Sequence, residues 1–288
     1  MSETLPSGAS RSIGSILVEA GRLSPEDASR IMEHQQQHNL QFGDAAISLS
    51  LLTKEDIDFA LARQFDYAYL NQQDTSLGTE LVAAYKPFSP IGESLRAVRS
   101  QLMLRWFNAD PLHKVIAVVS AGKGDGRSFI AANLAIVFAQ QGQRTLLMDA
   151  DLRAAPTEGQ HTLFKLGKSA GLSGILAGRC GLEAALAIPG LAGLTVLPTG
   201  AVPPNPQELL GRPDFGQLLG AAAQKFDVII IDTPAGANYA DAEIIAARAG
   251  AALMVARKNQ SLMPDVTLLA RRLQEGGVTL VGSVLNDG

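Results

Sequence analysis

The sequence has 288 residues, of which 47% are hydrophobic and 18% are charged, and this composition excludes a wholly disordered protein. The formal net charge of −4 gives no basic footprint for nucleic acid or anionic lipid, so we expect no nucleic-acid partner. A single cysteine, Cys180, excludes an internal disulfide, and no uncharged apolar run approaches the roughly 20 residues that span a bilayer. The first residues also lack the plan of a signal peptide. We therefore expect a cytoplasmic protein, for which any connection to a membrane would come through a partner.

The composition divides the chain into four segments. Residues 1–11 are small and polar and predict a disordered lead-in. Residues 12–71 have a helical pattern, and residues 72–90 are polar and proline-containing, which is typical of a linker. Residues 91–288 contain short β-branched runs that alternate with helical segments. This last pattern predicts an α/β domain with a doubly wound, mostly parallel sheet.

The helical segment contains an internal repeat. Ile13-Gly14 recurs as Phe42-Gly43 with an offset of 29 residues, and other positions repeat at the same offset. Ser24 and Thr53 each stand at an N-cap position, shortly before acids of a first helical turn. The repeat predicts a small all-α module of two hairpins, each with a short helix, a turn and a longer helix.

This module resembles the N-terminal domain of type II secretion and pilus ATPases, one version of which binds cyclic di-GMP through tandem repeats. In that version an arginine precedes each hydrophobic-glycine pair, whereas Ser12 and Gln41 occupy those places here. The second turn has Ser50 where the motif has glycine. We expect a protein-docking module, with cyclic di-GMP as the alternative ligand.

A glycine-rich loop lies between an expected strand at residues 115–119 and an expected helix at residues 129–141. A strand, such a loop and a helix form a phosphate cradle, because backbone N–H groups and the helix N-terminus face the anion. The hydroxyl of Ser128 is placed to bind Mg²⁺. Arg127 stands where the usual motif has lysine, and it keeps the positive charge in a forked group. The expected nucleotide-binding residues are Gly122, Lys123, Gly124, Asp125, Gly126, Arg127, Ser128 and Phe129.

Acidic residues follow two further expected strands. Asp149 and Asp151 end the apolar run at residues 145–148, and Asp232 ends the run at residues 228–231. Ligands bind at the carboxyl ends of the strands in such a sheet. One acid of the first pair could orient Mg²⁺ while the other accepts a proton, and Asp232 would face the metal or its water. We expect catalysis by Asp149, Asp151 and Arg127, and a metal site of Ser128, Asp151 and Asp232.

Over about residues 87–286 the sequence resembles the bacterial tyrosine kinases of exopolysaccharide and capsule synthesis, particularly the EpsG-type kinases. Asp149 and Asp151, with Arg153, match the second Walker-like motif of that family, and Asp232 matches its Walker B motif. The proline-rich string at residues 200–210 matches another characteristic stretch.

The resemblance also implies an assembly. Glu93, Arg96 and Arg99 match the E-x2-R-x2-R motif, and their spacing places them along one helical face. In the family this stripe joins subunits into a ring. The resemblance further implies ATP with Mg²⁺ as the phosphoryl donor and activation by a membrane-embedded, Wzz-like chain-length determinant.

Three functions remain open from the sequence. The first is phosphoryl transfer from MgATP to tyrosine, with Asp149 as the base and Arg127 as a phosphate clamp. The second is a nucleotide-gated scaffold of the export complex, which Arg127 favours. The lack of a tyrosine-rich tail favours it too, because the four tyrosines form no such tail. The third is a positioning ATPase like ParA or MinD, which carries lysine where this chain has Gly122. The tyrosines are Tyr67, Tyr69, Tyr85 and Tyr239.

Overall fold

The structure, a computed structural model, describes residues 12–64, 69–70, 74–155 and 158–287. The chain divides into two compact units at residues 71 and 72, and we describe each unit by itself. The predicted lead-in at residues 1–11 and Tyr67 lie outside the described residues.

The described residues of the first unit form four helices whose limits repeat with the same offset as the sequence. The short helices α1 (Ile13–Glu19) and α3 (Phe42–Ser48) begin 29 residues apart, as do the longer helices α2 (Pro25–His38) and α4 (Lys54–Gln64). The Ser24 hydroxyl accepts a hydrogen bond from the Asp27 amide at 3.0 Å, so it caps α2 as expected.

Glycine leaves room for close packing both between the repeats and within the second one. A Cβ atom at Gly14 would lie 3.2 Å from the Phe42 ring of the other repeat, and one at Gly43 would lie 3.3 Å from Ile57 of its own repeat. Arg22 links the repeats through an ion pair with Asp56 at 2.8 Å. The hydrophobic-glycine pairs therefore have a packing role inside the module. The buried core comprises Ile16, Leu17, Leu23, Ala28, Ile31, Ala45, Ala46, Leu52 and Ala60.

The second unit is built on a seven-stranded sheet in the order β3-β4-β2-β5-β1-β6-β7. All neighbouring strands are parallel except the edge pair β3–β4. The predicted doubly wound, mostly parallel fold is therefore confirmed. The strands are β1 (Val115–Val119), β2 (Thr145–Asp149), β3 (Leu186–Ala187), β4 (Leu194–Leu197), β5 (Val228–Asp232), β6 (Ala251–Arg257) and β7 (Thr279–Asn286).

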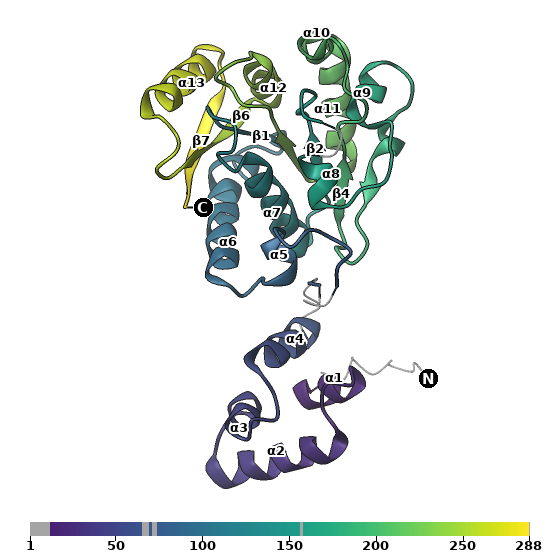
Figure 1. The fold of residues 1–288 in the computed structure, drawn as a ribbon, viewed down its shortest axis with the longest axis vertical. Helices are drawn as coiled ribbons and strands as arrows, with labels where there is room; N and C mark the ends of the chain where they lie inside the picture. Colours follow the sequence, from purple (N-terminus) through teal and green to yellow (C-terminus); the bar gives the residue numbers. More distant parts are fainter. Residues whose placement is uncertain (1–11, 65–68, 71–73, 156–157, 288) are drawn as a thin grey trace, which may run out of the picture. The chain divides into compact units, whose positions relative to one another are not determined.

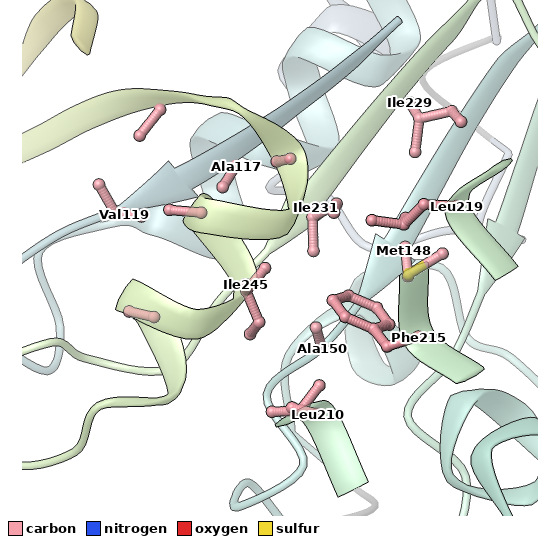
Figure 2. Close-up of a cluster of buried hydrophobic side chains, with 14 of the residues drawn as sticks. Ala117, Val119, Met148, Ala150, Leu210, Phe215, Leu219, Ile229, Ile231 and Ile245 are labelled. Carbon is pink, nitrogen blue, oxygen red and sulfur yellow. The ribbon is translucent and has the colours of Figure 1, made fainter. Parts of the chain in front are cut away.

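Helices cover both faces of this sheet (Figure 1). On one face, alternate strand residues such as Met148 and Ile231 pack against Phe215 and Ile245 from the helices (Figure 2). None of the described helices is long and apolar enough to cross a membrane. The helices are α5 (Val82–Tyr85), α6 (Pro90–Leu102), α7 (Arg127–Gln140), α8 (Gln160–Leu163), α9 (Gly171–Leu176), α10 (Pro206–Gly211), α11 (Pro213–Lys225), α12 (Asp241–Ala249) and α13 (Met263–Glu275), with a π-helical turn at η1 (Met103–Phe107) and a 3-10 turn at η2 (Leu182–Ala184).

The second half of the expected linker is part of the α/β unit. Within residues 72–90, Leu81 and the short helix α5 are buried. The Ala83 amide donates to the Asn133 side chain at 2.9 Å, and Gln140 donates to the Ala83 carbonyl at 2.8 Å. The linker prediction is corrected for this half. The prolines and polar residues of the segment are typical of a linker, but its apolar residues pack against α7.

Candidate active site

The glycine-rich loop connects β1 to α7, as the sequence predicts. Gly124 and Gly126 have φ angles of +85° and +97°, a region that favours glycine. A Cβ atom at Gly126 would lie 2.2 Å from Nδ2 of Asn286, which itself donates to the Asp125 carbonyl at 3.1 Å. The end of β7 therefore supports the loop from outside.

Arg127 is buried under the loop. Its Nε donates to the Thr233 carbonyl at 2.8 Å, and its Nη1 donates to the Gly122 carbonyl at 2.7 Å and to the Ser120 hydroxyl. The guanidinium thus ties the loop to the end of β5. Because Arg127 also lines the adjoining cleft, its charge remains close to that space.

Two other loop residues differ in exposure. Asp125 is buried and accepts a hydrogen bond from the Gly122 amide at 2.8 Å. The Lys123 side chain is 89% exposed, and its Nζ lies 3.9 Å from the Glu158 carboxylate. Asp125 consequently shapes the loop, whereas Lys123 is a solvated cation at its rim.

Asp149 and Asp232 are neighbours in the β2–β5 register, and both are buried. Asp149 accepts hydrogen bonds from the amides of Asp151 at 3.2 Å and Gln160 at 3.1 Å. The Gln160 side chain bridges to Asp232 at 2.8 Å and to the Ser128 carbonyl at 3.1 Å. Sequence reasoning missed Gln160, because nothing in its local pattern distinguishes it from a surface glutamine.

Burial raises the pKa of Asp149 well above its usual range, and the negative charge of Asp232 raises it further. Burial also raises the pKa of Asp232, although hydrogen bonding from Ser128 and the charge of Arg127 act in the opposite direction. Two carboxyl groups placed together out of water attract a cation or a proton.

Asp151 and Arg153 form the side of the site that follows β2. The Asp151 Oδ1 atom accepts hydrogen bonds from the amides of Arg153 at 3.2 Å and Ala154 at 3.1 Å. Arg153 forms an ion pair with the buried Asp241, and its guanidinium lies 3.8 Å from the centre of the Tyr239 ring. Both Asp151 and Arg153 are therefore held in place.

These elements surround a cleft of about 520 Å³. Its lining includes six of the predicted site residues, namely Lys123, Gly124, Arg127, Ser128, Asp151 and Asp232. Asp149, Gly122, Asp125, Gly126 and Phe129 are outside the lining.

The residues of the cleft fit magnesium and a polyphosphate. The Oδ1 atom of Asp232 is buried and has no hydrogen-bond partner in the part of the chain that the structure describes, and a cation or its water would supply one. Among the described residues, no three His, Cys, Asp or Glu side chains form a ready-made metal cluster. The predicted metal site of Ser128, Asp151 and Asp232 lines one cleft and stays a prediction.

The predicted assembly stripe lies on α6. Glu93 is exposed and pairs with Arg96, whereas Arg99 donates to the Val137 carbonyl of α7 at 2.8 Å. None of the three residues lines the cleft.

Known proteins show the same fold. The tyrosine-protein kinase etk of Escherichia coli (strain K12) is 33% identical over 215 residues, which make up 75% of this chain and 29% of that relative. The kinase domain of the Escherichia coli tyrosine kinase ETK has a TM-score of 0.68 and 31% identity, covering 77% of this chain and 85% of that domain. The cell division ATPase MinD of Pyrococcus furiosus has a TM-score of 0.51 and 26% identity, covering 60% of this chain and 71% of MinD. No family model matches the chain.

The fold, the loop and the acids at the ends of β2 and β5 define a P-loop nucleotide-binding domain. The sequence identity and the structural overlap with the kinase domain define the family more narrowly. The chain belongs to the bacterial tyrosine kinase family. It spans 29% of the length of the curated relative described above.

Proposed function

We propose that this protein transfers the γ-phosphoryl group of ATP to tyrosine side chains in the presence of Mg²⁺. The observation that carries the proposal is the cleft itself, which joins the phosphate loop to Ser128, Asp151 and the unpartnered Oδ1 of Asp232. Kinase-domain relatives with the same fold support this chemistry.

Each group has a separate role in this mechanism. MgATP, when bound, would supply the phosphoryl group together with a cation that offsets negative charge on its oxygens. Ser128 and Asp232 would hold the metal, while the loop amides and Arg127 orient the phosphates. Asp151 faces the cleft and would take the phenolic proton on its Oδ2, which is not used by the two amides. Asp149, the base expected from the sequence, does not line the cleft and would support Asp151 by accepting the hydrogen bond from its amide.

The same proposal includes the assembly of the protein and its partners. We propose that the α6 stripe of Glu93, Arg96 and Arg99 contributes to a homo-oligomer and that a membrane-embedded chain-length determinant recruits and activates the kinase. The process it serves would be exopolysaccharide synthesis. The N-terminal module would dock a protein partner, with cyclic di-GMP as the alternative.

A nucleotide-gated scaffold is the second candidate, and the anchoring of Arg127 favours it. Two of the guanidinium nitrogens are already bound to the protein, so this cation is less free to follow the moving phosphoryl group than a lysine would be. Such a protein would bind ATP and transfer little.

Labelled ATP distinguishes the two candidates. The purified chain is incubated with γ-labelled ATP and Mg²⁺, with and without a peptide from the partner's cytoplasmic segment, and phosphotyrosine is quantified beside an ATP-binding titration. Transfer that falls at least about a hundredfold in both Asp149→Asn and Asp151→Asn supports the kinase. Tight ATP binding without any transfer rejects it in favour of the scaffold.

A further inference from the structure

A second cavity lies in the α/β unit, apart from the nucleotide cleft. It has a volume of about 470 Å³ and shares no lining residue with the cleft of about 520 Å³. Its walls come from α9 and from the proline-rich string at residues 200–210, the distinctive stretch that the proposed reaction does not use.

Close backbone packing makes this cavity rigid. The amides of Leu172 and Ser173 donate to the carbonyls of Pro198 at 2.8 Å and Thr199 at 2.9 Å. Gly200 has a φ angle of +80°, and a Cβ atom there would lie 2.0 Å from the Ala170 carbonyl oxygen. The string and the start of α9 therefore form one wall that only glycine permits, and the cavity exists before any ligand binds.

The cavity has a positive, acid-free lining. Arg179 and Arg212 are exposed at its wall, and neither forms an ion pair among the described residues. None of the described lining residues is acidic. Two unpaired guanidinium groups beside one cavity favour an anion, and their forked donors match phosphate oxygens.

The other lining residues indicate which chemical group is attached to the anion. Ser173 is 7% exposed and adds a hydroxyl group at the wall. Val202, Pro203 and Pro204 provide an apolar surface next to the arginines. An apolar wall beside a cationic one suits an aromatic ring that ends in a phosphate better than it suits free phosphate.

We propose that this cavity binds the phosphotyrosyl side chain of a protein. The proposal rests on the proposed function, because a tyrosine kinase produces that group. Through this site the kinase would hold a phosphorylated chain without occupying its nucleotide cleft.

The test uses the 288-residue chain and a premade, fluorescein-labelled peptide with one phosphotyrosine among glycines and alanines. Fluorescence polarisation is expected to show saturable binding that persists at saturating MgATP. The double variant Arg179→Gln/Arg212→Gln should bind the peptide at least about tenfold more weakly, with unchanged affinity for ATP. The matched control is Arg271→Gln, which removes an exposed arginine that pairs with Glu275 on α13 and should bind like the wild type.

Three results would overturn the proposal. They are equal binding by the double variant, displacement of the peptide by MgATP, and equal binding of a peptide with glutamate in place of phosphotyrosine. Since the peptide is already phosphorylated, the result does not depend on turnover. A chain that binds it but transfers no phosphoryl group would contradict only the proposed kinase reaction.

Discussion

The side chain of Asp149 makes the stability of the protein depend on pH, because its carboxyl group is buried beside that of Asp232 and burial raises its pKa. Between the ordinary and the raised pKa the folded protein binds more protons than the unfolded chain, so the free energy of unfolding falls as pH rises through this window. We expect Asp149→Asn to flatten this dependence and to abolish phosphoryl transfer. Urea unfolding from pH 4 to pH 8 measures it, with the exposed Asp265→Asn as control. An unchanged pH dependence in Asp149→Asn would contradict the raised pKa.

Ser50 gives a second prediction at the residue scale. Its φ angle is +56°, and the equivalent residue of the first repeat is Gly21 at +68°. A non-glycine residue in this region costs about 1 kcal/mol. Ser50→Gly should therefore stabilise the module by about 0.5–1 kcal/mol, and Gly21→Ala should destabilise it by a similar amount. Amide hydrogen exchange of α3 and α4 reports the change, and faster exchange in Ser50→Gly would refute it.

At the scale of elements, the phosphate loop depends on β7 as well as on β1 and α7. Gly126→Ala would place its Cβ against Asn286 and strain a φ angle of +97°, so ATP should bind at least about tenfold more weakly. The matched control is Gly142→Ala, which has a φ angle of +87° but no atom within 4 Å of the added Cβ. Both variants carry similar backbone strain, so equal ATP affinities would show that the contact with Asn286 is unimportant.

The separation of the contacting elements along the chain explains which parts of the site the sequence could predict. The loop and Asp232 follow apolar strands, and a strand, its end and the next helix are neighbours in sequence. Gln160 and the ion pair of Arg153 with Asp241 were missed, because these contacts join segments far apart in the chain. The buried helix α5 has a linker-like sequence for the same reason, since its partners lie far along the chain on α7.

At the scale of the whole molecule, the division into two units predicts which unit a bound nucleotide stabilises. MgATP at about one hundred times its Kd should stabilise the folded α/β unit by about 2.7 kcal/mol. Hydrogen exchange should slow at the loop, at Asp151 and around Asp232, while α1–α4 exchange as before. Addition of EDTA should reverse most of this protection. Equal protection of α1–α4 would instead show that the module responds to the nucleotide.

The end of β7 connects the phosphate loop to the edge of the sheet. Asn286 donates through its side chain to the Asp125 carbonyl and accepts from the Lys258 amide through its backbone, at 3.1 Å and 2.9 Å. A shift of the loop around phosphates would be transmitted through one side chain to the outermost strand of the sheet. A dye on a cysteine at position 287, in a Cys180→Ser background, would convert that displacement into an optical signal of nucleotide occupancy.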